Sequence, residues 1–435
     1  VFLDAQQDGV FVGLRLIHAL LELGYGGRTL GWTILTTKSH AVLPGERATG
    51  HHAGVDGLVA AMAKEQANWQ VRLVDIGAED PLPMEAILRL PAQGAGHGLV
   101  HRMGEWYVQK LVPFALPEPG WVPWRRGGVY VVVGGASGVG AVFSEYVIRT
   151  VGAQIVWIGR RPHDAQIASL QEELSILGPR PDYISADATE REALAAALET
   201  IRVRYGAVHG LVHSALVLDD KSLANMDPAR FARGYDAKLA TAVRMAEVFG
   251  TEPLDFVLFF SSMQALSGAP GQSNYAAGCT AMDGFALELG KRLACPVRIM
   301  DWGYWGETGS VATPEHRARM AKGGVGSITA EEGMAAVVGL MATQRPRLAF
   351  VKTLKGFAFE GHVAHEIVTL AGARLSSNQS HSFEPLPDRH WKAPTWMEET
   401  IDEAARLDGA VRDLLWAHLC QNAGLGKGVT ATRPA

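Results

Sequence analysis

The chain has 435 residues, of which 48% are hydrophobic and 20% charged, and its formal net charge is −5. The length predicts two or three domains, and the composition predicts a globular protein with enough apolar residues for a core. Because acidic residues outnumber basic ones, nucleic-acid binding is not expected.

The cysteines and the apolar runs exclude two further classes of protein. Cys279, Cys295 and Cys420 lie far apart and lack C-x-x-C spacing, so the sequence predicts neither a metal site nor a disulfide framework, and a cytoplasmic location is expected. No apolar run reaches ~18 residues, the length of a membrane span. The chain begins without Met in a strand-like segment at residues 1–3, and we interpret it as an excerpt of a longer polypeptide.

Residues 1–117 show strands that alternate with helices. Strands are predicted at 33–37 and 69–74, and helices at 10–24 and 53–67. This alternation is typical of a parallel α/β sheet. Since no glycine-rich phosphate loop follows a strand here, we interpret the segment as a structural, non-catalytic Rossmann-like subdomain.

A turn-rich linker at 118–127 precedes the second α/β part of the chain. Strands and helices alternate repeatedly over 128–355, which predicts a doubly wound parallel sheet. Residues 356–435 differ in character, with a polar loop and an amphipathic helix expected at 395–422. We interpret this last part as a linker or helical extension, or as the start of a following domain.

The second part opens with a nucleotide-binding pattern. A predicted strand at 129–133 runs into G-x-x-x-G-x-G, and a helix follows from about 141. Small residues allow the backbone to turn tightly and approach a pyrophosphate, whose charge then lies at the helix N-terminus. A glycine-rich turn alone is weak support, but the flanking strand and helix favour a dinucleotide. The residues predicted to bind it are Gly134, Gly135, Ser137, Gly138, Val139 and Gly140.

The next predicted strand, 154–158, ends close to Arg160 and Arg161. Folds that prefer NAD place an acidic residue here to bind the ribose, whereas arginine matches the 2′-phosphate of NADP in charge and geometry. The alternative is a solvated surface pair. Asp187, after a predicted strand at 183–186, could accept a hydrogen bond from the adenine amino group.

Three residues further along form a candidate catalytic group for ketone reduction. Ser262 ends a predicted buried strand, Tyr275 begins a helix, and Lys238 lies upstream on a helix that starts near residue 227. After hydride transfer to a carbonyl carbon, the oxygen needs a proton. Tyr275 is the predicted acid, Lys238 is expected to lower its pKa from the usual ~10, and Ser262 is expected to orient the carbonyl.

The order of these residues resembles one branch of the short-chain dehydrogenase/reductase superfamily. Most members carry the lysine four residues after the tyrosine, but Cys279 stands there in this chain and Lys238 is upstream. This exchanged order resembles the ketoreductase domains of modular polyketide synthases over about 1–355. The resemblance implies NADPH as the reductant, a β-ketoacyl group on the phosphopantetheine arm of an acyl carrier protein, and neighbouring synthase domains.

The resemblance also assigns further site residues. It implies cofactor contacts for Ala188 and Ser214, besides Lys238 and Tyr275. At Cys279 the family usually has an Asn that helps to hold the lysine and a relay water, and a thiol hydrogen-bonds more weakly. Because Tyr-Ala-Ala-Gly-Cys resembles a variant of the trans-acyltransferase synthases, we expect activity.

Two markers point to the stereochemical class. The resemblance implies that Leu218, Asp219 and Asp220 guide the pantetheine arm and mark the B-type class, which gives a D-configured hydroxyl. The A-type class has a Trp where this chain has Ser267. An ordinary turn with paired acids is the alternative interpretation of Asp219 and Asp220. Trp302 is expected to border the nicotinamide, ahead of a lid helix.

The expected lid helix spans about 314–321 and would exclude water from the site. Two alternatives to a carrier-dependent reductase stay open. One is a free-standing reductase of small ketones. The upstream lysine and the absence of a phosphate loop from the first part argue against it. The other is a redox-silent or epimerising scaffold domain, in which Cys279 marks lost activity.

Overall fold

The computed structural model describes residues 2–78, 80, 82–92, 98–117, 122–309 and 312–354. The chain divides into two compact units, Val1–Leu370 and Ala371–Ala435, and every described residue lies in the first. The helix expected at 395–422 therefore lies outside the described residues.

The first sheet has four strands in the order β1-β2-β3-β4, of which the first three are parallel and the last pair is antiparallel. Its strands are β1 (Leu30–Thr37), β2 (Trp69–Ile76), β3 (Leu99–Arg102) and β4 (Glu105–Val108). The helices and short turns of this part are α1 (Ala5–Asp8), α2 (Val10–Glu22), η1 (Tyr25–Gly27), α3 (Ala53–Glu65) and α4 (Met84–Arg89). The predicted strands at 33–37 and 69–74 and both predicted helices are confirmed.

The expected strand at 1–3 is wrong. Residues 2–4 form a turn that leads into α1. The apolar Phe2 packs its ring edge-on against Phe285, with 5.3 Å between the ring centres. Phe2 is thus apolar because it packs in the tertiary structure. The spacing of apolar residues in so short a segment does not distinguish such packing from a strand.

The second sheet has seven parallel strands in the order β11-β10-β9-β8-β5-β6-β7. They are β5 (Val129–Val133), β6 (Gln154–Gly159), β7 (Asp182–Ser185), β8 (Gly210–His213), β9 (Phe256–Ser262), β10 (Val297–Trp302) and β11 (Arg347–Phe350). The strand order reverses between β5 and β8, the switch point at which doubly wound sheets bind ligands. The predicted α/β class with a doubly wound sheet is confirmed.

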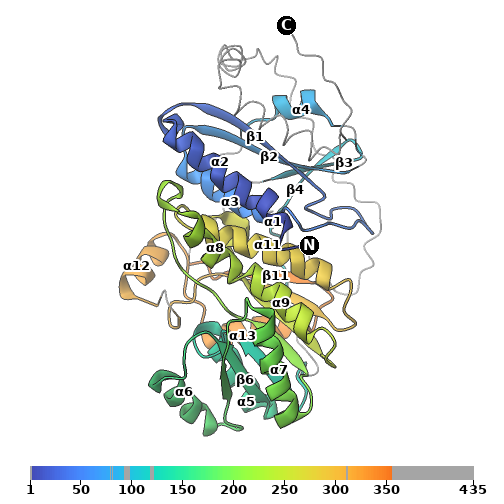
Figure 1. Cartoon of the computed structure of the whole chain (residues 1–435), viewed down its shortest axis with the longest axis vertical. Helices are drawn as coiled ribbons and strands as arrows, with labels where there is room; N and C mark the ends of the chain where they lie inside the picture. The colour runs from blue at the N-terminus through green and yellow to red at the C-terminus, as the bar shows by residue number, and fades with distance from the viewer. Residues whose placement is uncertain are drawn as a thin grey trace. The chain divides into compact units, whose positions relative to one another are not determined.

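Helices cover both faces of this sheet (Figure 1). They are α5 (Gly138–Val151), α6 (Ala165–Ser175), α7 (Arg191–Tyr205), η2 (Leu223–Asn225), α8 (Pro228–Asp236), α9 (Leu239–Phe249), α10 (Gln264–Ser267), α11 (Ser273–Leu289), α12 (Pro314–Lys322) and α13 (Ala330–Met341). One core cluster joins the sheet to α5, α6 and α13, and the other joins it to α7, α8, α9 and α11. Both faces are thus buried, as a parallel sheet requires.

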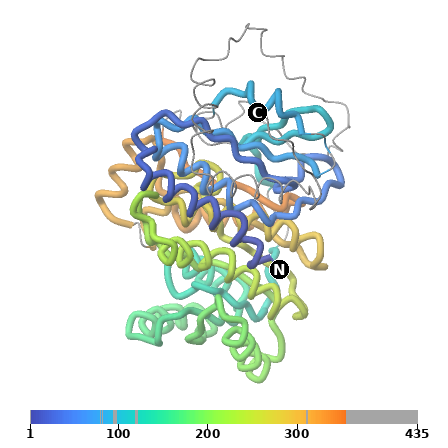
Figure 2. Tube along the Cα trace, turned by 45° about the horizontal axis from the view of Figure 1, so that its top comes forward, coloured from blue at the N-terminus to red at the C-terminus, as the bar shows by residue number. Residues whose placement is uncertain are grey.

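The second cluster continues into the first subdomain. Leu14 and Leu58 share it with Phe231 and Ala277, and the blue trace of α2 runs beside the yellow-green trace of α8 in Figure 2. Contact is closest between α3 and α11, where a Cβ atom on Gly57 would lie 2.3 Å from the Ala276 carbonyl. A glycine is needed there because the two helix backbones touch.

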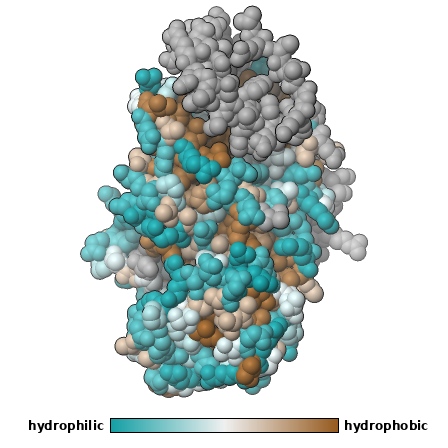
Figure 3. Space-filling view, in the orientation of Figure 1, coloured by the Kyte–Doolittle hydropathy of each residue, from teal (hydrophilic) through white to brown (hydrophobic). Residues whose placement is uncertain are grey.

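The described surface is mainly polar on the side shown in Figure 3, where hydrophilic atoms prevail over α6 and α12. α12 buries none of its residues. No helix among the described residues is long and apolar enough to cross a membrane.

Candidate active site

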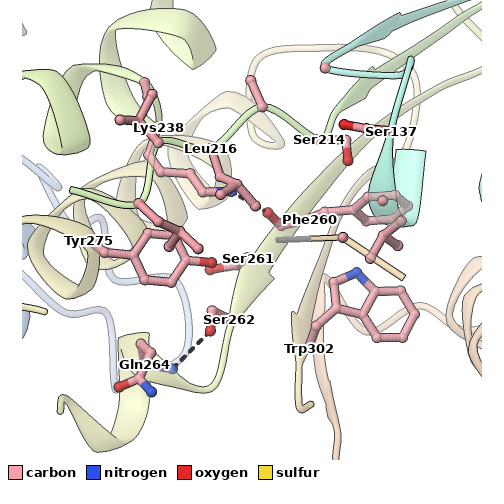
Figure 4. Close-up of a pocket in the computed structure, with 18 of the residues that line it drawn as sticks. Ser137, Ser214, Leu216, Lys238, Phe260, Ser261, Ser262, Gln264, Tyr275 and Trp302 are labelled. Atoms are coloured by element: carbon pink, nitrogen blue, oxygen red, sulfur yellow. Dashed lines mark hydrogen bonds between the residues drawn. The ribbon is translucent and has the colours of Figure 1, made fainter. Parts of the chain in front are cut away.

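A cavity of about 1220 Å³ opens at the carboxyl ends of β5, β6, β8 and β9 (Figure 4). It is built by loops that follow these strands, which is where a parallel sheet leaves space at its switch point. The predicted residues that line it are Gly134, Ser137, Gly138, Val139, Arg160, Arg161, Asp187, Ala188, Ser214, Leu218, Asp220, Lys238, Ser262, Tyr275 and Trp302. Gly135, Gly140, Asp219 and Cys279 do not line it.

The glycine-rich loop turns through left-handed backbone at two positions. Gly134 has φ 78° and Gly138 has φ 57°, a region that costs any residue with a Cβ atom. A Cβ on Gly134 would also lie 2.7 Å from the Ala215 backbone. The loop leads directly into the first turn of α5, so free backbone N–H groups face the cavity side where a phosphate could bind.

Gly135 and Gly140 lie behind this loop, which differs from the predicted cofactor contact. A Cβ on Gly135 would lie 2.2 Å from the Trp157 ring, and one on Gly140 would lie 2.9 Å from the Gly134 carbonyl oxygen. Their small size lets α5 pack closely on the sheet. The spacing pattern could not separate this packing role from contact with a ligand.

The two arginines differ in their surroundings. Arg160 is exposed and, among the residues that the structure describes, none pairs with its guanidinium. Arg161 donates a hydrogen bond to Gln166 at 3.0 Å and lies 3.5 Å from the Asp164 carboxylate. Beyond the end of the neighbouring strand β7, Asp187 accepts hydrogen bonds from the Thr189 backbone and hydroxyl at 2.9 and 2.7 Å. Arg160 is therefore the freer cation of the pair.

Lys238 and Tyr275 come together from distant parts of the chain. Lys238 lies between α8 and α9, and not on the helix that begins near 227, because that helix ends at Asp236. Its Nζ atom donates a hydrogen bond of 2.9 Å to the Phe260 carbonyl and lies 5.7 Å from the centre of the Tyr275 ring. Burial lowers the pKa of Lys238, while nearby Cys279 and Asp283 raise it.

The pKa of Tyr275 shifts opposite to the expectation. Burial raises it well above 10, Cys279 adds to the increase, and interaction with Ser262 opposes it. The Lys238 ammonium was expected to lower this pKa, but desolvation of the phenol dominates. Tyr275 is consequently a neutral phenol across the physiological range.

Ser262 stands at the end of β9, beside Tyr275 (Figure 4). Its hydroxyl accepts a hydrogen bond of 3.2 Å from the Gln264 backbone and also interacts with the Tyr275 hydroxyl. Cys279 lies one turn below Tyr275 on α11 and is fully buried. Burial raises the pKa of its thiol to about 12, so the group is uncharged.

Sequence reading missed a buried ionic cluster behind these residues. Arg347 lies 2.8 Å from the Asp283 carboxylate and 2.6 Å from that of Asp301. Burial raises the pKa of Asp283, against the opposing charge of Arg347. These residues come from α11, β10 and β11, so no local pattern connects them.

The two acids of the predicted guiding triplet point in different directions. Asp219 turns away from the cavity and forms ion pairs with Arg230 and Arg233 of α8, the latter at 2.6 Å. Asp220 lines the cavity and accepts a hydrogen bond of 2.7 Å from Gln272. The first acid therefore holds the loop to α8, while the second faces the ligand space.

The aromatic wall and the lid helix lie where the sequence places them. Trp302 is buried at the end of β10 and packs edge-on against Phe260 and Trp305, with ring centres 5.6 and 5.1 Å apart. The expected helix at 314–321 is α12, and its residues His316, Arg319 and Met320 line the cavity. The described residues contain no group of three metal-ligating side chains.

Comparison with known proteins agrees with this geometry. Residues 128–307 match the family model described as the KR domain. Over 350 residues, 80% of this chain, the sequence is 45% identical to polyketide synthase PksN of Bacillus subtilis and 41% identical to polyketide synthase ThaG of Burkholderia thailandensis. The chain spans only 6% of the length of each relative.

A solved structure described as A-type ketoreductases from a modular polyketide synthase superimposes with a TM-score of 0.68. It is 28% identical, and the match covers 78% of this chain and 72% of that one. The fold and the site thus define an oxidoreductase of the short-chain dehydrogenase/reductase type. Within that class, residues 128–307 belong to the ketoreductase (KR) domain family, and the chain is similar to parts of polyketide synthases.

Proposed function

We propose that this domain uses NADPH to reduce a β-ketoacyl thioester, carried by an acyl carrier protein, to the β-hydroxyacyl thioester. The observation that carries the proposal is the meeting of Lys238, Tyr275 and Ser262 on the wall of the cavity that also holds the glycine-rich loop. A single small ligand usually occupies ~300–1000 Å³. The 1220 Å³ cavity accordingly suits a dinucleotide together with an acyl substrate.

The residues present fit a phosphorylated dinucleotide. Gly134 and Gly138 form a backbone cradle that a Cβ would obstruct or strain. The exposed Arg160, which pairs with no other described residue, offers the donors of its guanidinium to a 2′-phosphate. When bound, NADPH supplies a hydride to the carbonyl carbon. Asp187, which lines the cavity after the neighbouring strand β7, would accept a hydrogen bond from the adenine amino group.

The chain's own residues supply the proton and the orientation. Ser262 donates to the carbonyl oxygen and stabilises its growing negative charge. Tyr275, neutral because burial raises its pKa, gives its phenolic proton to the same oxygen. A C–H and an O–H bond form as the C=O double bond is lost, and the Tyr275 phenolate then recovers a proton from solvent.

Lys238 assists this step through its charge. Held by the Phe260 carbonyl, the ammonium lies close to the Tyr275 ring, where it stabilises the phenolate that forms on proton transfer. A high ground-state pKa for Tyr275 is compatible with catalysis, since an alkoxide is a far stronger base than a phenolate. Cys279 occupies the position behind both side chains as a neutral, weakly hydrogen-bonding group.

The finer assignments rest on sequence markers. We propose B-type stereochemistry because Leu218, Asp219 and Asp220 form the marker triplet and Ser267 replaces the A-type Trp. Trans-acyltransferase ancestry is supported by the residues between Tyr275 and Cys279. Of these markers, Leu218, Asp220 and Ser267 line the cavity, whereas Asp219 and Cys279 do not.

We further propose the domain plan expected from the sequence. Residues 1–117 form the structural subdomain, 118–127 the linker, 128–355 the catalytic subdomain, and 356–435 an extension. The similarity to parts of much longer synthases supports neighbouring synthase domains and an acyl carrier protein partner. The few, widely spaced cysteines support a cytoplasmic setting.

The test is turnover of a β-ketoacyl pantetheine-type thioester by the purified chain, followed as NADPH consumption and by chiral analysis of the product. We expect a single D-configured β-hydroxy thioester, and turnover lower by roughly 10²-fold or more in Tyr275→Phe. Tight NADPH binding without turnover would instead identify the silent scaffold. Turnover of small free ketones in preference to the thioester would identify the free-standing reductase.

A further inference from the structure

We propose that Lys64 and Glu65, at the end of α3 in the first subdomain, position the two loops that form the substrate side of the cavity. They would thus control how the ketone is presented to Tyr275 without touching it. The assignment of the cavity as the ketone site rests on the proposed function. The contacts of Lys64 and Glu65 with the loops are independent of that function. The first subdomain, which has no glycine-rich phosphate loop, would then contribute to the selectivity of the reaction.

Lys64 holds the first of these loops, which connects α10 to α11. Its Nζ atom donates hydrogen bonds to two successive carbonyls, those of Ser267 and Gly268, the latter at 3.0 Å. Gly268 adopts φ 56°, and a Cβ there would lie 2.6 Å from the Ala60 side chain of α3. The loop therefore presses directly on α3 at the lysine.

Glu65 binds both loops with one carboxylate. Its Oε1 atom accepts a hydrogen bond of 2.8 Å from the Gly271 N–H, and Oε2 accepts one of 2.6 Å from the Leu223 N–H. Burial raises the pKa of Glu65, and these two N–H groups lower it. A direct bond of 2.9 Å from the Lys221 N–H to the Gly271 carbonyl joins the loops beside the carboxylate.

These loops supply one wall of the cavity next to the catalytic tyrosine. The first loop runs through Gln272 into α11, whose first turn carries Tyr275. The second loop connects β8 to η2 and contains the predicted guiding triplet at 218–220. The cavity-lining residues that they contribute are Ser267, Ala269, Pro270 and Gln272 from the first, and Leu216, Val217, Leu218 and Asp220 from the second. The hydrogen bond between Gln272 and Asp220 closes the gap between them.

The arrangement separates substrate placement from cofactor binding. Charged hydrogen bonds to loop backbone are stronger than neutral ones, and irregular loops depend on such bonds for a fixed conformation. Neither Lys64 nor Glu65 lines the cavity, and none of the bonds described involves the glycine-rich loop at 134–140. Loss of the clamp should loosen the substrate wall and leave the cofactor wall intact.

The closing experiment compares Glu65→Gln and Lys64→Met with Glu22→Gln, which removes an exposed charge from α2 of the same subdomain. Hydrogen exchange measured by mass spectrometry tests the clamp without any substrate. We expect faster exchange at 218–223 and 267–272 in the two clamp variants and unchanged exchange at 129–140. Unchanged exchange in both loops would overturn the proposal.

Product analysis tests the consequence for selectivity. With an α-methyl-β-ketoacyl thioester, we expect the ratio of major to minor stereoisomer to fall about tenfold, equivalent to ~1.4 kcal/mol, while the Kd for NADPH stays within about twofold. Lys64→Arg, which keeps two donors, should restore the ratio. A ratio that stays constant as activity falls with the folded fraction would contradict the role in selectivity.

The two hypotheses fail differently. If the unaltered chain reduces no thioester, the proposed function is wrong, and the exchange data still decide whether the clamp exists. If thioester reduction is normal and selective but the clamp variants match Glu22→Gln in exchange and product ratio, only the clamp is wrong. Melting temperature, measured on the same samples, separates local loosening from global unfolding.

Discussion

The Nζ atom of Lys238 lies 5.7 Å from the centre of the Tyr275 ring, although Lys238 lies just ahead of α9 and Tyr275 lies in α11. The lysine is anchored to the sheet through the Phe260 carbonyl, and the tyrosine is fixed in the first turn of α11. Exchange of the lysine from α11 to the start of α9 thus preserves the ammonium–phenol proximity that proton transfer requires.

Replacing Tyr275 by Phe should remove the proton donor and little else. We expect turnover to fall by roughly 10²-fold or more, because general acid catalysis contributes about 10²–10⁴-fold. Since the ring remains, the Kd for NADPH should be nearly unchanged. Steady-state kinetics with a β-ketoacyl thioester and a fluorescence titration of NADPH measure the two effects. Near-normal turnover would refute Tyr275 as the acid.

Arg160 should contribute more to the preference for NADPH than Arg161. The guanidinium of Arg160 is exposed and unpaired among the described residues, whereas Arg161 is already held by Asp164 and Gln166. A charged hydrogen bond is worth about 1.5–3 kcal/mol, so Arg160→Ala should raise the Kd for NADPH roughly 10–100-fold and leave that for NADH unchanged. Arg161→Ala is the matched control. Equal losses for both cofactors would reject the phosphate contact.

His213 should make the fold sensitive to mild acid. It is fully buried at the end of β8, hydrogen-bonds the Lys238 carbonyl at 2.9 Å, and has its pKa lowered by burial and by Lys238 from 6.5 to about 3. Below pH 6.5 the unfolded chain binds a proton that the folded chain does not. This group alone therefore lowers the free energy of unfolding by about 1.4 kcal/mol per pH unit as the pH falls toward 3.

Urea titrations of the chain and of His213→Gln, at a series of pH values from neutral down to the onset of acid unfolding, measure this contribution. The variant keeps a donor for the Lys238 carbonyl but has no titrating ring. Its stability should be less dependent on pH over the same interval. Parallel curves for the two proteins would show that His213 is already charged in the folded state.

Cys279 should resist alkylation while the protein is folded. Its thiol is fully buried with a pKa raised to about 12, whereas Cys295 is half-buried and more accessible to a reagent. Thiolate is the reactive form, so iodoacetamide should label Cys295 first and Cys279 only after urea is added. Peptide mapping by mass spectrometry distinguishes the two sites. Rapid labelling of Cys279 in the folded state would contradict its burial.

Gly57→Ala should destabilise the packing of α3 on α11. Alanine normally favours a helix over glycine by ~1 kcal/mol, but here the new Cβ would lie 2.3 Å from the Ala276 carbonyl. Overpacking of this kind costs about 1–3 kcal/mol, which should appear as a lower midpoint of urea unfolding. Gly27→Ala, where a Cβ meets nothing within 4 Å, should be close to neutral. A gain in stability for Gly57→Ala would contradict the tight helix contact.

The sequence predicted those parts of the site whose chemistry is local. The glycine pattern at 134–140, the strand ends at Arg160 and Ser262, and the helix start at Tyr275 each follow from turn and periodicity rules that act over a few residues. The repeated alternation of strands and helices likewise predicted the doubly wound sheet. These features need no knowledge of which segments meet in space.

The features that sequence reading missed all depend on distant contacts. Burial of Tyr275 reversed the expected direction of its pKa shift, and the buried pairing of Arg347 with Asp283 has no local pattern. Gly135 was assigned to the cofactor although it accommodates Trp157. The contact of Glu65 with a loop of the other sheet joins residues 206 positions apart, so no local pattern indicates it.

The close backbone approach of α3 to α11 bears on the construction of hybrid synthases. If only the part of the chain after residue 122 is exchanged, α11 of another synthase would pack against Gly57 of this chain. A bulkier residue at the contact on either helix would force the two helices apart and shift Tyr275 in the first turn of α11. The upstream junction of an exchanged segment should therefore lie ahead of α1, so that both sheets are transferred together.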